Sequence, residues 1–114
     1  MWSEAIACAM LNALTWVGLV WMAPQPVISH GRTWLVAAGS IALINGGLWL
    51  ALVGLNVTLL PVWAIAFPAV NALWEHLGLT RLTDRPIPPL WAIAIHPLAL
   101  GLMSVLLAGT LGII

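Results

Sequence analysis

The sequence predicts an all-α integral membrane protein, built as a bundle of four transmembrane helices. Hydrophobic residues make up 63% of the 114 residues and charged residues only 5%, whereas soluble domains carry about 25% charged residues. The charges are also unevenly placed, because none occurs from Thr33 to Trp74. Such a chain cannot form a water-exposed surface. Lipid is the solvent in which its apolar side chains cost nothing and its few charges are expensive.

The first helix is expected over residues 4–22, close to the length of about 20 apolar residues that spans a bilayer. Ser3 precedes it as a potential N-cap, and Pro24 and Pro26 follow its end. The N-terminus lacks the basic segment of a secretory signal, so we interpret this helix as retained in the mature chain.

The uncharged run over residues 33–74 is too long for one span. As a single helix it would measure about 60 Å, roughly twice the thickness of the hydrocarbon core. We place the break at 54–61, where Asn56 favours a turn and Pro61 suits the first position of a new helix. The resulting second helix covers residues 33–55 and the third covers 61–77.

Residues 78–88 contain three of the six charges and predict a loop, after which two prolines open a fourth helix over 89–112. Four spans place both termini on one side of the membrane and the loops 23–32 and 78–88 on the other. The positive-inside rule makes these loops cytoplasmic and places both termini outside. A bias this small leaves dual topology open. It rests on three arginines: Arg32, Arg81 and Arg85.

Most of the eight tryptophans fall near the ends of the predicted helices, as in the aromatic belt of membrane proteins. Those near the arginine-bearing loops are Trp21, Trp34, Trp74 and Trp91. Trp2 and Trp63 fall near the opposite ends, whereas Trp16 and Trp49 lie deeper and are expected to pack between helices.

The two halves of the chain resemble each other. Residues 5–14 (AIACAMLNAL) and 64–73 (AIAFPAVNAL) are identical at six of ten positions, including Asn12 and Asn71. We interpret this as a possible repeat of a two-helix unit, with two parallel repeats, 5–55 and 64–112, about an axis along the membrane normal. Chance similarity between alanine-rich apolar segments is the alternative. Small residues also recur at four-residue spacing, which favours close helix approach.

Polar side chains inside a membrane span are candidates for function. Asn71 and Glu75 share a face of the third helix, and His96 precedes Pro97, which would kink the fourth helix and open space. We expect Asn71, Glu75 and His96 to converge beneath the 78–88 loop as ion-, proton- or ligand-binding residues, with His76 nearer the interface. The other asparagines inside the expected helices, Asn12 and Asn45, are expected to form interhelical polar contacts.

The main functional hypothesis is an oligomeric transport or permeation protein, with its polar site in the cytoplasmic half of helices three and four. The alternative is an accessory or anchor subunit of a larger respiratory or photosynthetic membrane complex. The expected partners are the lipid bilayer and further copies or other membrane subunits. Zero net charge gives no indication of nucleic acid. Catalytic residues are not predicted, because Ser, Thr and His lack a recognisable spacing.

No cofactor is expected. The single cysteine, Cys8, excludes an internal disulfide and a cysteine-based metal site. The remaining ligands are too few for zinc, and metal binding otherwise stays open. Ala92 stands four residues before His96, a spacing compatible with a tetrapyrrole on the histidine, which is the weaker alternative.

Overall fold

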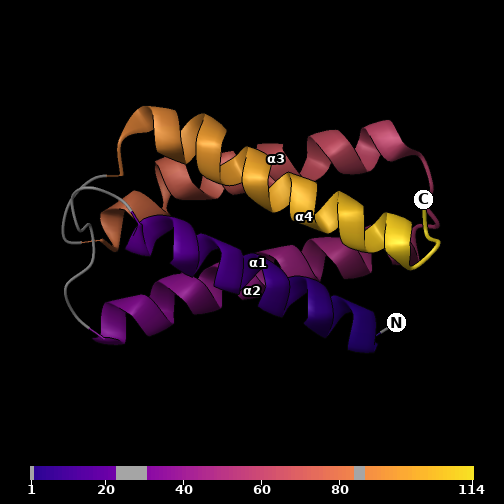
Figure 1. Ribbon diagram of the computed structural model, residues 1–114, viewed down its shortest axis with the longest axis horizontal. Coiled ribbons are helices and arrows are strands. Elements are labelled where there is room, and N and C mark those ends of the chain that lie inside the picture. Colours follow the sequence, from indigo (N-terminus) through magenta and orange to yellow (C-terminus); the bar gives the residue numbers. More distant parts are fainter. Residues whose placement is uncertain (1, 23–30, 84–86) are drawn as a thin grey trace.

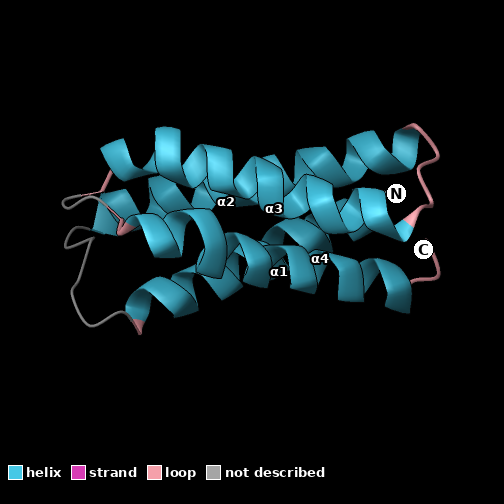
Figure 2. Cartoon of the chain, turned by 90° about the horizontal axis from the view of Figure 1, so that it is seen from above, coloured by secondary structure: helices cyan, strands magenta, loops and turns pink. Residues whose placement is uncertain are grey.

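The computed structural model describes residues 2–22, 31–83 and 87–114 (Figures 1 and 2). All regular structure in these residues is helical, so the prediction of an all-α chain with four helices is confirmed. The helices are α1 (Trp2–Trp21), α2 (Gly31–Gly54), α3 (Leu60–Leu77) and α4 (His96–Thr110), together with a short 3-10 helix η1 (Leu79–Arg81) and a π-helical turn η2 (Trp91–Ile95) that leads into α4.

Three helical segments are long and apolar enough to cross a membrane: Trp2–Trp21, Gly31–Gly54 and Trp91–Thr110. The molecule is 39 Å long, which fits a hydrocarbon core of about 30 Å with its interfaces. Large apolar side chains point outward in the middle of the helices: Leu14 is 66% exposed and Leu43 78% exposed. An outer surface of this kind suits lipid as the surrounding medium.

The chain folds as two crossing hairpins. α1 packs most closely against α2, and α3 against α4, and the helices of each pair cross near their midpoints (Figure 1). Contacts of α1 with α4 and of α2 with α3 close the bundle, so α1 and α3 stand diagonally. Both termini lie at one end of the bundle (Figure 2), and α1 and α3 end at the opposite one. These are called the terminal end and the loop end below.

The turn between the two hairpins forms as the sequence predicts. Asn56 has a φ of 56°, a left-handed conformation that asparagine tolerates better than most residues. The Val57 and Asn56 N–H groups donate to the carbonyls of Leu52 and Val53, at 2.9 and 3.0 Å. These two bonds satisfy carbonyls left open at the end of α2.

The buried side chains form two apolar clusters, one toward each end of the bundle. The cluster at the loop end is built around Trp16, Ile41 and Leu100. The cluster at the terminal end is built around Trp49, Trp63, Phe67 and Ala108. Between the two clusters each helix contributes one buried polar residue, and these four are called the polar layer: Asn12, Asn45, Asn71 and Ser104.

Small residues allow the helices to approach closely within the hairpins. A Cβ added at Gly46 would lie 3.2 Å from the Cβ of Ala9, at the crossing of α1 and α2. A Cβ at Gly101 would lie 2.5 Å from the Cγ of Pro68, so the proline ring of α3 occupies the space beside the glycine of α4. Some of the small residues therefore serve the packing of helices within this chain.

Two positions differ from the sequence-based expectation. Trp63 is fully buried, and its Nε1–H donates to the carbonyl of Val57 at 2.9 Å, so it is a packing residue instead of an interfacial anchor. Arg32 belongs to the first turn of α2 instead of the preceding loop. The expected loop 23–32 lies outside the described residues up to position 30, as do positions 84–86 of the expected loop 78–88.

Candidate functional site

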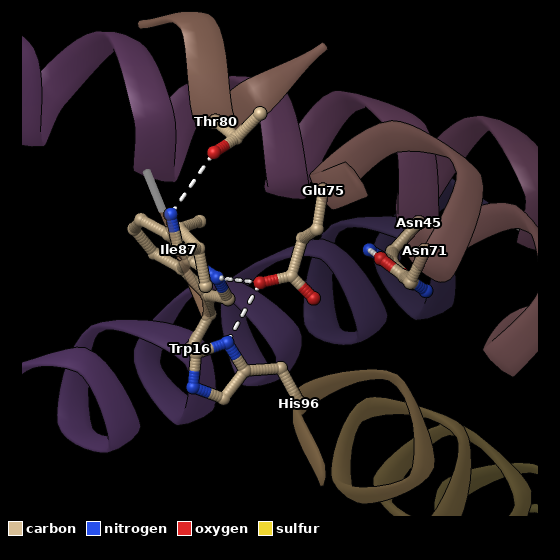
Figure 3. A network of polar contacts seen from close by, with 7 residues as sticks. All are labelled: Trp16, Asn45, Asn71, Glu75, Thr80, Ile87 and His96. Carbon is tan, nitrogen blue, oxygen red and sulfur yellow. Dashed lines mark hydrogen bonds and ion pairs between the residues drawn. The ribbon is translucent and has the colours of Figure 1, made fainter. Parts of the chain in front are cut away.

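The centre of the candidate site is Glu75, near the end of α3. Its side chain is fully buried, and one carboxyl oxygen, Oε1, has two partners from different helices (Figure 3). The indole Nε1–H of Trp16 on α1 donates to Oε1 at 2.7 Å. The imidazole Nδ1 of His96, at the start of α4, lies 2.7 Å from the same oxygen. One carboxyl group therefore links three helices.

The contact between His96 and Glu75 contains one shared proton. Either the imidazole Nδ1–H donates to a carboxylate, or the protonated carboxyl group donates to a neutral Nδ1. The distance of 2.7 Å is compatible with either form. His96 is only 3% exposed, so an unpaired charge at this position would be costly and the two groups stabilise each other. The pair is chemically able to receive a proton on one side and release it on the other.

A local departure from α-helical geometry places His96. The sequence predicts a kink at Pro97, and the structure contains a π-helical turn over Trp91–Ile95 directly before it. The His96 N–H bonds to the carbonyl of Trp91, five residues back. Turns of this kind are often found at functional sites. The ring of Trp91 packs against the imidazole, with centroids 5.7 Å apart.

The stretch that leads into this turn is tied to η1. The backbone N–H of Ile87 donates to Oγ1 of Thr80 at 2.9 Å (Figure 3). Ile87 is buried and belongs to the apolar cluster at the loop end. This bond holds the chain across the loop end of the bundle, on the side of Glu75 that faces η1.

Two atoms of the pair have no hydrogen-bond partner within the part of the chain that the structure describes. Among the described residues, four buried side-chain atoms have no hydrogen-bond partner: Asn12 Oδ1, Trp49 Nε1, Glu75 Oε2 and His96 Nε2. Buried polar groups are normally satisfied, and an exception calls for an explanation such as a bound water, an ion or a functional role. In Figure 3 the free oxygen of Glu75 is directed away from His96, toward the side where Asn45 and Asn71 lie.

The polar layer lies next to this site, toward the middle of the bundle. The amides of Asn45 and Asn71 bond to each other twice, each nitrogen donating to the other oxygen at 2.8 Å. Asn12 donates to Oγ of Ser104 at 2.9 Å. The thiol of Cys8 lies 3.8 Å from the backbone carbonyl oxygen of Asn45 and 3.8 Å from the Ser104 hydroxyl, so it adjoins one residue of each pair.

The structure brings together some of the residues expected at the site and separates others. Glu75 and His96 are in direct contact. Asn71 lies one turn away on the same face of α3, but its amide bonds to Asn45. His76 is exposed and points away from the bundle interior.

Sequence reasoning missed Trp16 and Ser104. Trp16 was interpreted as packing alone, and its position one turn after Asn12 on the buried face of α1 was the available signal. Ser104 is one of the small residues that recur at four-residue spacing, and a serine in a membrane span is also a potential interhelical hydrogen-bonding group.

The surroundings of the pair do not fit the larger cofactors. Within the described residues, no group of three or more His, Cys, Asp or Glu side chains is placed to hold a metal ion. Ala92 and His96 are both buried inside the bundle. A tetrapyrrole at Nε2 would have to displace the side chains around the imidazole, so we derive no role for one.

Comparison of the chain with known protein families, with curated proteins and with solved structures finds no match. The functional argument therefore rests on the residues of the site and on their geometry.

Proposed function

We propose that this protein is a small polytopic membrane protein that mediates proton permeation or proton-coupled transport, with the Glu75–His96 pair as its proton-binding site. The observation that carries the proposal is the buried carboxyl–imidazole contact of 2.7 Å, whose Oε2 and Nε2 atoms find no partner in residues 2–22, 31–83 and 87–114. Ionisable residues inside a membrane bundle are costly, and proton relays are among their characteristic uses. The imidazole is suited to this task because one ring nitrogen can accept a proton while the other donates one.

A proton suits this interior better than a hydrated ion does. The bundle axis is filled by large buried side chains, among them Trp16, Trp49, Trp63 and Phe67. A metal cation would need several oxygen ligands in place of its water shell, whereas a proton needs only successive hydrogen-bonding groups. Glu75, His96 and the neighbouring polar layer supply such groups in the middle of the protein.

The proposal includes four membrane spans, α3 among them, although α3 is shorter than the segments Trp2–Trp21, Gly31–Gly54 and Trp91–Thr110 and carries Glu75 and His76. An antiparallel bundle in which α1, α2 and α4 cross the bilayer needs a fourth span to join α2 to α4. The loop end is proposed to be cytoplasmic, because Arg32 and Arg81 lie there, and both termini are then outside.

We further propose that the chain acts as an oligomer. An apolar groove of about 300 Å³ lies on the outside of the first hairpin, and its lining includes Ala5, Ala9, Ala42, Gly46 and Gly47. Small residues of this kind allow a helix to pack closely in lipid. A helix of a second copy is the proposed occupant, and the molecular mass of the detergent-solubilised protein tests this.

Reconstitution into liposomes tests the function. A pH gradient is imposed across the liposome membrane, and a potassium gradient with valinomycin sets the membrane potential. A pH-sensitive dye inside the liposomes reports proton entry. Glu75→Gln and His96→Gln keep hydrogen-bonding capacity but remove the ionisable groups, and both should reduce the flux to the level of empty liposomes. His76→Gln is the matched control, because His76 neighbours Glu75 in sequence but is exposed. It should conduct like the unmodified protein.

Two results would overturn the proposal. The first is unchanged flux in Glu75→Gln, which would separate the pair from permeation. The second is an inactive wild-type protein that purifies with other subunits. That result would favour the alternative function, an accessory or anchor subunit of a larger membrane complex.

A further inference from the structure

The buried faces of α1 and α3 correspond to each other at a constant shift in sequence. A shift of 59 residues superimposes four of the five buried positions of α1 on buried positions of α3 and η1, whereas the fifth, Ala5, corresponds to the exposed Ala64. The corresponding residues are Cys8 with Phe67, Asn12 with Asn71, Trp16 with Glu75, and Val20 with Leu79. This is the shift that relates the similar segments 5–14 and 64–73.

The interhelical hydrogen bonds follow the same correspondence. Asn12 of the first hairpin donates to Ser104 on the second helix of the other hairpin. Asn71 of the second hairpin donates to Asn45 on the second helix of the first. Exchange of the two hairpins therefore converts one bond into the other, as expected for two repeats related by an approximate two-fold axis.

Equivalent residues of a two-fold arrangement can touch only near the axis. Trp16 and Glu75 are equivalent by the 59-residue shift, and their side chains meet at 2.7 Å. If position 16 also carried a glutamate, its carboxyl group would face that of Glu75. Two like charges at this distance would oppose the ionisation of both groups. An indole at position 16 instead presents an N–H donor to the carboxyl group.

We propose that Trp16 is the positioning residue of the proton-binding pair. It belongs to the first of the two equivalent hairpins and occupies the position that corresponds to Glu75 in the second hairpin. This inference rests on the proposed function. The indole N–H fixes Oε1 between two partners, so that this oxygen faces His96 while Oε2 has no partner in the described ranges. Among the described residues, the titratable side chain in contact with Glu75 is His96, and Arg81 on η1 is exposed.

The test observes the Glu75 carboxyl group by isotope labelling, which is possible because the chain contains few glutamates. Glu4 and Glu75 are the only ones, so in a Glu4→Gln background ¹³C-carboxyl glutamate labels Glu75 alone. Infrared spectra of this protein in liposomes then report the hydrogen bonding of that carboxyl group, and proton flux is measured on the same sample.

Trp16→Phe keeps an aromatic ring but removes the donor. The labelled carboxyl band should move to higher frequency, and the flux should fall about tenfold, the effect typical of losing a hydrogen bond to a charged group. Trp74→Phe is the matched control, since its indole donates to Ser40 at 2.9 Å, away from Glu75. It should change neither quantity.

The outcomes separate this inference from the proposed function. An unmoved band in a folded Trp16→Phe protein overturns the contact and with it the inference. A moved band with normal flux overturns the positioning role. A moved band in a protein whose wild type conducts no protons overturns the proposed function but supports Trp16 as the residue that orients Glu75.

Discussion

The side-chain amides of Asn45 and Asn71 form a closed pair between α2 and α3. Each amide nitrogen donates to the oxygen of the other residue at 2.8 Å. Each nitrogen also donates to a carbonyl of its own helix, that of Ile41 or Phe67, four residues earlier. All four amide N–H groups are thus used. The pair therefore joins the two hairpins, and its amide N–H groups need no other hydrogen-bond acceptor.

This closed pair predicts strong coupling between the two asparagines. Asn45→Leu or Asn71→Leu leaves the other amide buried with lost partners, so each should destabilise the bundle by about 1 kcal/mol. The double variant should cost less than the sum of both. Unfolding in mixed detergent and dodecyl sulfate, followed by tryptophan fluorescence, measures the free energies. Additive effects would contradict the pairing.

The sequence was informative about the fold because segment length and charge are local properties. The charge-free run over 33–74 had to contain two helices, and the turn at Asn56 follows from the chemistry of that residue. Glu75 and His96 could be brought to one end of the bundle by counting residues along the helices.

The partners of these side chains could not be predicted, because they depend on how the helices rotate about their axes. Asn71 shares a face with Glu75, yet the crossing of α2 directs its amide to Asn45. The contact of Trp16 with Glu75 joins diagonal helices, and no pattern within either helix specifies it. Four alanine-rich helices of similar hydropathy offer several rotations with comparable apolar faces.

A second prediction concerns the crossing of α3 and α4. Gly101→Ala should destabilise the protein by about 1–3 kcal/mol, because the added methyl group collides with the ring of Pro68 and tightly packed interiors resist such additions. Gly109→Ala, in the same helix with open space around the glycine, should be neutral or slightly stabilising. Thermal denaturation in detergent compares the two.

A second substitution should restore the stability that Gly101→Ala removes. Pro68→Ala removes the ring atoms that the new methyl group would meet, so Gly101→Ala/Pro68→Ala should recover most of the lost stability. If Gly101→Ala and Gly109→Ala proved equally stable, α3 and α4 would not approach as closely as the structure indicates.

A third prediction concerns orientation. In a Cys8→Ala background the chain contains no other cysteine, so single cysteines can be placed at exposed positions of either end. Ser3→Cys and Thr110→Cys should react with a membrane-impermeant maleimide in intact cells, because both termini are proposed to be outside. Leu82→Cys at the loop end should react only after permeabilisation.

The arginines provide the control for this experiment. Arg32→Ala/Arg81→Ala removes two of the three arginines of the sequence and should shift part of the population to the opposite orientation. Equal labelling of both ends in the unmodified sequence would instead show a dual topology and contradict a fixed orientation.

The last prediction compares two tryptophans of the same apolar cluster. Trp49 and Trp63 are both fully buried and pack edge to face, with ring centroids 5.0 Å apart. The Nε1–H of Trp63 donates to the carbonyl of Val57, whereas Nε1 of Trp49 has no partner among the described residues. The same substitution by phenylalanine removes similar packing from both positions, and the hydrogen bond distinguishes them.

Trp63→Phe should therefore destabilise the protein more than Trp49→Phe, by about 1 kcal/mol, because it also leaves the Val57 carbonyl unpaired while the Trp49 substitution relieves an unsatisfied donor. Unfolding by dodecyl sulfate, followed by far-ultraviolet circular dichroism, measures both variants without relying on tryptophan fluorescence. An equal or larger loss in Trp49→Phe would mean that its indole N–H has a bound partner. A water molecule inside the terminal cluster would then extend the hydrogen-bonding groups of the polar layer toward the terminal end.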